Sequence, residues 1–221
     1  MELLEAIKDR HSVRSYSDRK IEGDVKDRLQ QKINDCNKES GLNMQLVLDE
    51  PKAFDNLFMH YGRFSGVRNY IALIGAKTDD LEEKCGYYGE KVVLYAQTLG
   101  LNTCWVGVGY QKKPNAYTVG ADEKLCLMMA IGYGNEQGKA HKSKTFQQVV
   151  RVNGDVPTWF VRGVEAALLA PTAVNQQQFR FILDGDRVSA KSGIGFFSKV
   201  DLGIVKYHFE VGAGKANFQW G

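Results

Sequence analysis

The same order of local features occurs twice along this chain of 221 residues, and this repetition limits the folds that the chain can adopt. A Gly-Asp pair precedes an apolar-periodic segment at Asp24 and again at Asp155. The spacing from Asp24 to Asp155 equals the spacing from Ser12 to Ser143. Features that recur in the same order at a constant offset indicate a structural unit that is present more than once.

The apolar segments of the two halves also correspond. Met44–Asp49 (MQLVLD) parallels Phe179–Asp184 (FRFILD), and both are predicted to be strands. Gly89–Trp105 parallels Gly203–Trp220, since each begins with a glycine, continues as a helix and ends in a tryptophan followed closely by glycine. We therefore expect two diverged copies of one unit.

We expect the first copy to span residues 1–133 and the second copy, which lacks part of the middle, to span residues 134–221, with both in one compact unit. Periodicity, caps and apolar runs predict the remaining elements. Helices are expected at Glu2–Arg10, Asp24–Cys36, Lys84–Leu99 and Asp155–Leu169, and further strands at Tyr70–Gly75, Thr103–Val108 and Leu125–Gly132.

Composition excludes several classes of function. The net charge of +3 is too small to imply nucleic-acid binding, because the basic residues are dispersed among acids. No apolar run approaches the ~20 residues of a bilayer span, and Met1–Arg10 lacks the apolar core of a signal peptide. The four cysteines, Cys36, Cys85, Cys104 and Cys126, have no zinc-site spacing. We expect buried thiols, a reducing cytoplasm, and no metal, nucleic-acid or membrane partner.

A polar segment, Ala170–Phe181 (APTAVNQQQFRF), lies between a predicted helix and a predicted strand. Pro171 fixes the backbone φ there. Thr172, Asn175 and the glutamines that follow offer short hydrogen-bonding side chains. Such a segment suits a ligand better than a core.

A second segment, Arg10–Tyr16 (RHSVRSY), offers positive charge near the N-terminus. Arg10, Ser12 and Arg14 alternate along an extended stretch, so their side chains can point to one side. Two guanidinium groups and a hydroxyl suit a phosphate, which arginine binds through two parallel hydrogen bonds. A solvated turn after the first helix is the alternative.

These two segments resemble the two halves of the flavin site in the nitroreductase family, whose typical strings are R-R/H-S-x-R/K-x-F/Y and A-P-S-x-x-N-x-Q-P-W-x-F. Thr172, Gln178 and Phe179 stand where the family has serine, proline and tryptophan. The resemblance implies an α+β, nitroreductase-like fold with a central, mainly antiparallel sheet flanked by helices. In the family the two motifs meet across a dimer interface. Here the second motif lies in the second copy, so we expect a monomer that mimics the dimer and binds one flavin between its halves, with a homodimer as the alternative.

The resemblance implies further contacts to FMN. Trp105, Val106 and Gly107 match a segment that runs under the flavin, where a backbone N–H can donate to flavin N5. Lys142 and Lys144 stand where the family has a K-x-R pair near the phosphate. The expected cofactor-binding residues are Arg10, His11, Ser12, Arg14, Asn69, Trp105, Val106, Gly107, Lys142, Lys144, Pro171, Thr172, Ala173 and Asn175. His11 is expected to act through its backbone, and no side chain is expected to serve as a catalytic acid or base.

The implied function is that of an FMN-dependent oxidoreductase that takes hydride from NAD(P)H and reduces a nitroaromatic, a quinone or a similar small acceptor. Arg14 is expected to stabilise negative charge on the reduced flavin. Two alternatives stay open. One is an FMN-binding sensor or degenerate paralogue with little turnover, because Gln178 and Lys144 depart from the family pattern. The other is a cofactor-free scaffold on the same fold, in which Trp105 belongs to a core and Asn69 to a turn.

Overall fold

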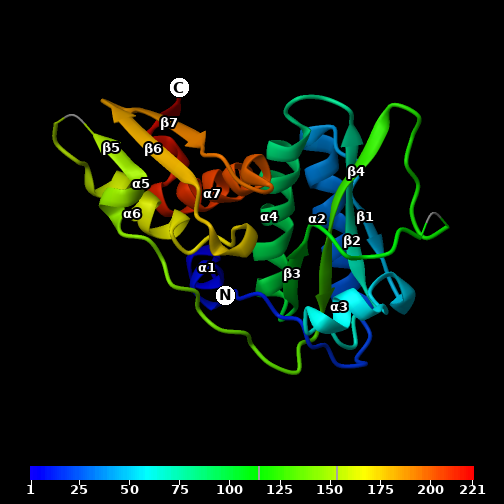
Figure 1. The fold of residues 1–221 in the computed structure, drawn as a ribbon. Helices are drawn as coiled ribbons and strands as arrows, with labels where there is room; N and C mark the ends of the chain where they lie inside the picture. The colour runs from blue at the N-terminus through cyan, green and yellow to red at the C-terminus, as the bar shows by residue number, and fades with distance from the viewer. Residues whose placement is uncertain (114, 153) are drawn as a thin grey trace. The chain divides into compact units, whose positions relative to one another are not determined.

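The computed structural model describes residues 1–113, 115–152 and 154–221, which form two compact units (Figure 1). Unit 1 consists of Met1–Lys8, Glu82–Glu90 and Ala140–Gly221. Unit 2 consists of Asp9–Leu81 and Lys91–Lys139. The long helix α4 (Leu81–Thr98) contributes residues to both units. The division of the sequence at residue 133 stays a prediction.

Unit 2 contains a four-stranded sheet in the order β1-β2-β4-β3, and every neighbouring pair in it is antiparallel. Its strands are β1 (Gln45–Val47), β2 (Tyr70–Ala76), β3 (Asn102–Val106) and β4 (Glu123–Gly132). Its helices, besides the end of α4, are α2 (Gly23–Ser40), α3 (Leu57–Tyr61) and the 3-10 turn η1 (Pro51–Ala53).

Alternation along the strands places the core of unit 2 on a defined face of this sheet. Tyr70, Ala72 and Ile74 of β2 belong to the same buried cluster as Cys104 and Val106 of β3. Successive strand residues point to opposite faces, so this two-residue spacing gathers them on one side. The intervening residues of β2 are buried as well, which is why Tyr70–Gly75 reads as a continuous apolar run.

Unit 1 contains a second four-stranded sheet, in the order β5-β6-β7-β8. The central pair β6–β7 is antiparallel, whereas β5–β6 and β7–β8 are parallel. Its strands are β5 (Val150–Val152), β6 (Phe179–Asp184), β7 (Arg187–Ser192) and β8 (Gln219–Trp220). Its helices are α1 (Leu3–Asp9), α5 (Phe146–Val149), α6 (Thr158–Ala167) and α7 (Ser198–Ala213), with the 3-10 turns η2 (Ala173–Asn175) and η3 (Lys215–Asn217).

Aromatic side chains fill the core of unit 1. The ring of Phe209 on α7 is stacked on Phe181 of β6, with centroids 4.7 Å apart. Phe160, Phe218 and Trp220 contact the same ring at centroid distances of 5.6, 5.1 and 5.6 Å. Aromatic residues bury large apolar areas, so α6, α7 and the sheet are held together around Phe209.

Two glycines let α4 and α7 approach closely within unit 1. A Cβ at Gly86 would lie 2.0 Å from the carbonyl oxygen of Val200. A Cβ at Gly203 would lie 2.0 Å from the carbonyl oxygen of Glu83. Any side chain at either position would therefore push the two helix backbones apart.

The structure corrects three details of the sequence prediction. The helix predicted from Asp155 begins at Thr158, because Pro157 suits a helix start and Gly154 has a φ of 106°. Gly203 lies inside α7 rather than at its start, where it serves the close packing just described. The strand predicted to reach Val108 ends at Val106.

Both halves show one order of elements: helix, two antiparallel strands, helix, strand. In the first half these are α2, β1, β2, α4 and β3, and in the second half α6, β6, β7, α7 and β8. The last strand differs, since β3 pairs with β4, whereas β8 pairs directly with β7. Descent of the two halves from one duplicated unit stays a prediction.

None of the four cysteines forms a disulfide, and Cys36, Cys85 and Cys104 are buried as expected, whereas Cys126 is half-buried. Within the described ranges, no helix has both the length and the apolar character needed to cross a membrane.

Candidate functional site

In unit 2, the N-terminal arginine segment runs beside strand β3. The backbone N–H of Val13 donates to the carbonyl oxygen of Thr103 over 3.1 Å, and Ser12 pairs with Thr103 in a parallel bridge. Two segments that are about ninety residues apart in the sequence are thus neighbours. The expected residues Arg10, His11, Ser12 and Arg14 therefore lie next to the strand that carries Trp105, Val106 and, just beyond its end, Gly107.

The polar groups of this segment converge on Cys104. Burial raises the pKa of the Cys104 thiol, while the positive charges of Arg14 and Arg10 and a hydrogen bond with Ser12 oppose the rise. Two cations and a hydroxyl of the N-terminal segment thus act on the thiol of Cys104 on β3. We call Arg10, Ser12, Arg14 and Cys104 the arginine cluster.

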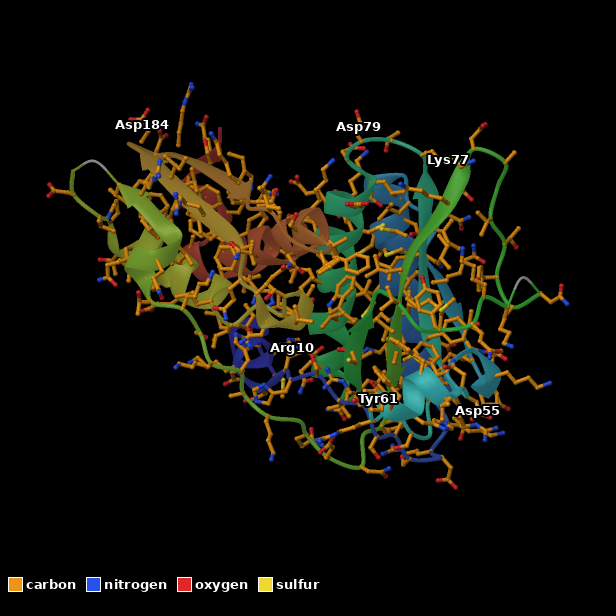
Figure 2. The ribbon with its side chains drawn as sticks, viewed as in Figure 1. Arg10, Asp55, Tyr61, Lys77, Asp79 and Asp184 are labelled. Carbon is orange, nitrogen blue, oxygen red and sulfur yellow. The ribbon has the colours of Figure 1, made fainter. Side chains whose placement is uncertain are left out.

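The two arginines lie at different depths. Arg10 is only 3% exposed (Figure 2), whereas Arg14 is exposed, with its guanidinium carbon 5.7 Å from the ring centroid of Phe64. The segment buries Val13 and Tyr16, which are three residues apart, so it does not alternate like a regular strand. Arg10 and Arg14 therefore differ in exposure, and the expectation that their side chains point to one side stays a prediction.

A glycine turn packs against His11. Gly138 has a φ of 72°, and a Cβ there would lie 2.8 Å from the Cβ of His11 and 3.0 Å from the carbonyl oxygen of Ser12. Only glycine combines this left-handed backbone with so close an approach. The backbone of residues 11 and 12 is therefore held from this side as well as from β3.

Asn69 lies apart from the arginine cluster within unit 2. Its backbone oxygen accepts from the N–H of Ile131 on β4, and β4 separates β2 from β3. Its side-chain Oδ1 accepts from the N–H of Asp49 over 3.1 Å. The amide thus fixes the chain after β1, and its contact with a flavin stays a prediction.

In unit 1, the polar segment after α6 has an unusual backbone. Val174, Asn175 and Gln177 have φ values of 45°, 55° and 47°. Positive φ is uncommon for residues other than glycine and is an outlier for a β-branched residue such as valine. Strained conformations of this kind cluster at ligand sites, which supports a binding role for the segment.

Gln177 joins this segment to the lysine segment. Its buried side chain accepts from the N–H of Lys144 over 2.8 Å and donates to the carbonyl oxygen of Lys142 over 2.9 Å. The Lys144 ammonium donates to the Gln177 carbonyl oxygen over 2.8 Å. The structure therefore brings together two segments that the sequence offered separately.

Other expected residues belong to the same network. The Asn175 amide donates to the Lys142 carbonyl oxygen over 3.0 Å and accepts from Gln177 over 2.8 Å. The Thr172 hydroxyl accepts from the N–H of Gln177 over 3.0 Å. Asn175 and Thr172 thus shape the segment, with Pro171 and Ala173 in its half-buried backbone. We call residues 171–177 together with Lys142 and Lys144 the amide cluster.

Three residues of this region were not predicted, namely Gln176, Gln177 and Asp201. The two glutamines stand inside the quoted motif, so their hydrogen-bonding capacity was visible. Asp201 lies in the first turn of α7, far along the chain, and is 3% exposed. Burial raises its pKa to about 6, while hydrogen bonds from Gln176 and the Ala173 N–H oppose the rise. Its one sequence signal is an acid inside the apolar run Val200–Val205 of α7.

Taken separately, each cluster offers donors that suit an anionic, hydrogen-bonding ligand better than a metal. Guanidinium, ammonium, hydroxyl and backbone N–H groups are all donors to phosphate oxygens. Across residues 1–113, 115–152 and 154–221, no group of His, Cys, Asp and Glu side chains could hold a metal ion.

Comparisons with known proteins agree with this chemistry. The family described as "Putative TM nitroreductase" matches residues 2–213. A crystal structure of a "putative nitroreductase" from Thermotoga maritima is 26% identical, with a TM-score of 0.67, and the match covers 98% of this chain and 85% of that one. No curated protein matches the chain.

More distant solved structures share the fold. A nitroreductase family protein from Streptococcus pneumoniae is 12% identical with a TM-score of 0.55, covering 68% of this chain and 99% of that one. A nitroreductase-like family protein from Bacillus cereus is 16% identical with a TM-score of 0.50, covering 67% and 94%. The expected α+β, nitroreductase-like fold is confirmed, and because the family match spans almost the entire sequence, the chain belongs to the TM nitroreductase family.

Proposed function

We propose that this protein is an FMN-dependent oxidoreductase that accepts hydride from NAD(P)H and reduces a nitroaromatic, a quinone or a similar small acceptor. Membership of a nitroreductase family supports an oxidoreductase. The observation that carries the proposal is the hydrogen-bonded pairing of the Arg10–Arg14 segment with β3. This pairing places cationic donors beside β3. Gly107, just after the end of β3, belongs to the segment that matches the family's flavin segment.

The arginine cluster would hold the phosphate and ribityl parts of the cofactor. Arg10 is a buried cation, and arginine binds phosphate through two parallel hydrogen bonds. The Ser12 hydroxyl adds a donor at the same point of β3. The exposed Arg14 would stabilise negative charge that develops on the ring, since a nearby cation favours the anionic form.

The amide cluster would present backbone groups to the cofactor. Its side-chain amides are engaged with each other and with Lys142 and Lys144. The backbone between Thr172 and Asn175 remains available to a ligand, because these residues are half-buried or exposed. Asn175 would therefore act by fixing that backbone. These bonds engage only the carbonyl of Lys142, so its ammonium could bind an anion.

When bound, FMN supplies the hydride chemistry itself. The residues of the chain bind the cofactor, orient it and place charge around it. No residue of either cluster needs to transfer a proton for this role.

Two experiments test the proposal, first flavin binding and then flavin reduction. Purified protein is mixed with FMN, and the quenching of flavin fluorescence is titrated to obtain Kd. NADH or NADPH is then added without oxygen, and the loss of flavin absorbance is followed with and without a nitroaromatic or quinone acceptor. Binding, bleaching by the nicotinamide and recovery by the acceptor are expected. Binding without bleaching would indicate a sensor or degenerate paralogue, and absence of binding would indicate a cofactor-free scaffold.

A further inference from the structure

The Asp201 carboxylate is hydrogen-bonded to the polar segment of unit 1. Asp201 belongs to the first turn of α7 and is 3% exposed. Its oxygens lie 3.0 and 3.2 Å from the backbone nitrogen of Ala173, which donates to them. The Gln176 amide donates to the same carboxylate over 2.7 Å. A buried acid on a neighbouring helix thus holds both ends of η2.

The backbone between these two contacts cannot be held by its own packing. Val174 is 90% exposed, and Asn175 is exposed as well. Both residues have positive φ, which costs free energy that surrounding interactions must offset. The bonds to Asp201 on one side, together with those to Gln177 and Lys142 on the other, contribute to that offset.

Gln176 extends this connection to the chain segment before α7. Its amide also donates to the carbonyl oxygen of Phe196 over 2.7 Å. The direct donors to Asp201 are therefore uncharged. The cations on the elements that meet here are Lys199, two positions before Asp201 on α7, and Lys142 and Lys144 on the lysine segment, where the Lys144 ammonium donates to Gln177.

We propose that Asp201 is a positioning residue for the cofactor: its ionised carboxylate holds Ala173–Gln176 in the binding conformation, and protonation of the carboxylate releases this backbone. The inference rests on the proposed FMN function, because it assigns the held backbone to that cofactor. The proposal names a residue outside both family motifs and predicts that the affinity for FMN depends on pH through the ionisation of this residue.

The chemistry at this position argues for a binding role over a purely structural one. Burial opposes the charged form, so an ionised carboxylate here weakens the fold, as the upward shift of its pKa indicates. An asparagine would avoid that cost, but it replaces one acceptor oxygen by an NH2 group and leaves a single neutral oxygen to accept from both Ala173 and Gln176, which are donors that an ionised carboxylate binds more strongly. Asp201→Asn should thus weaken the affinity for FMN without lowering the stability of the fold.

The experiment compares Asp201→Asn, Asp201→Glu and Asp184→Asn. Asp184 is an exposed carboxylate at the end of β6 (Figure 2), so its replacement makes the same chemical change in the same unit without touching η2. The Kd for FMN is measured by fluorescence quenching from pH 5 to pH 8, thermal midpoints are recorded by circular dichroism, and amide hydrogen exchange of residues 173–177 is measured without FMN.

Loss of a charge-assisted hydrogen bond predicts that Asp201→Asn raises Kd at least about tenfold at pH 8. Exchange at residues 173–177 should be faster, without a lower thermal midpoint. The phosphate of FMN titrates near the same pH, so each variant is compared with the natural protein at each pH. The difference in Kd should shrink toward pH 5, and Asp201→Glu should restore part of the affinity.

Three results would overturn the proposal. They are an unchanged Kd in Asp201→Asn at pH 8, a change equal to that of Asp184→Asn, or a lower thermal midpoint that accounts for the weaker binding. Failure of the proposed function looks different, because the natural protein itself would not bind FMN. In that case the exchange measurement still decides whether Asp201 holds the segment.

Discussion

Nε2 of His208 lies 2.8 Å from Oε1 of Glu90, and both side chains are completely buried in unit 1. Nδ1 of His208 is 3.1 Å from the carbonyl oxygen of Ala166. A carbonyl can only accept, so Nδ1 carries a hydrogen. The contact between Nε2 and Glu90 therefore contains one shared proton, and it ties α4 to α7 inside an apolar core.

Removing one member of this pair should be costly. Glu90→Ala leaves Nε2 of His208 without its carboxylate, and breaking a buried pair typically costs about 3–5 kcal/mol. Glu90→Gln should cost much less, because the Gln amide can donate to the neutral ring while Nδ1 keeps its hydrogen. Urea unfolding of the three proteins measures the difference.

An ion pair near the surface provides the control. Lys91, the next residue on α4, lies 2.6 Å from Glu39, and the two side chains are 15% and 52% exposed, whereas both partners of the His208 pair are completely buried. Such pairs contribute about 0–1 kcal/mol, so Glu39→Ala should change stability only slightly. Equal losses in the free energy of unfolding for Glu39→Ala and Glu90→Ala would show that burial does not increase the cost of breaking the His208–Glu90 pair.

The close approach of α4 and α7 makes a second prediction. Gly203→Ala places a Cβ 2.0 Å from the backbone of Glu83, which cannot rotate away, and we expect a loss of about 3 kcal/mol or more. Gly41→Ala is the matched change, because its φ of 73° is strained but nothing lies within 4 Å of the new atom. It should cost about 1 kcal/mol. A smaller loss at Gly203 than at Gly41 would contradict the packing argument.

These glycines show what local sequence patterns can and cannot predict. Apolar runs and stop signals predicted β2, β6 and α4 nearly to their ends, because burial and backbone preference are local properties. Gly203 looked like the start of a repeated helix, although its purpose is contact with Glu83 on a distant helix. Such a contact is a property of the packed structure, and no sequence neighbour of Gly203 indicates it.

The candidate site divides in the same way. The family motifs identified Arg10 and Asn175, since these positions are recognised by residue type and spacing. The depth of Arg10 and the internal engagement of Asn175 depend on which strand or loop packs against them. Asp201 was missed because its partners, Ala173 and Gln176, are local to each other but distant from it in the sequence.

Arg10 should be required for the affinity for FMN. Arg10→Ala removes a buried cation, and we expect Kd to rise by about tenfold or more, as loss of charged hydrogen bonds predicts. Arg10→Lys should keep the charge but lose the two-pronged contact, and so bind with intermediate affinity. Fluorescence quenching measures both, and circular dichroism verifies that each variant is folded.

The control for Arg10 is Arg28→Ala on α2. Arg28 is exposed and forms its contacts with Asp24 and Tyr95, so its loss should leave Kd unchanged. If Arg10→Ala is folded and binds FMN as tightly as Arg28→Ala, the arginine cluster does not bind the phosphate.

Asn175→Ala should weaken FMN binding through the backbone. The substitution removes the bond to the Lys142 carbonyl oxygen and one partner of Gln177, so the left-handed conformation at residues 174–177 loses support. We expect a Kd several-fold higher, since a neutral hydrogen bond contributes about 1 kcal/mol. Asn175→Gly, which adopts positive φ without strain, should bind more tightly than Asn175→Ala. Equal or weaker binding by Asn175→Gly would mean that strain of the left-handed backbone does not determine the affinity.

The pH dependence of folding provides a final prediction, at Asp201. Its pKa is about 6 in the folded chain and 3.8 in an ordinary aspartate, so between these values the folded state holds a proton that the unfolded state has released. The contribution of this group to stability is therefore complete below about pH 4, falls as the pH rises toward 6, and is constant above. The whole loss should be on the order of 3 kcal/mol, from 1.36 kcal/mol per pKa unit, and roughly two thirds of it should fall between pH 4.5 and pH 7. Urea unfolding at pH 4.5 and pH 7 should show that Asp201→Asn lacks this part of the slope, while Asp184→Asn keeps it. An identical slope in Asp201→Asn and the natural protein would mean that the buried carboxylate ionises without cost to the fold.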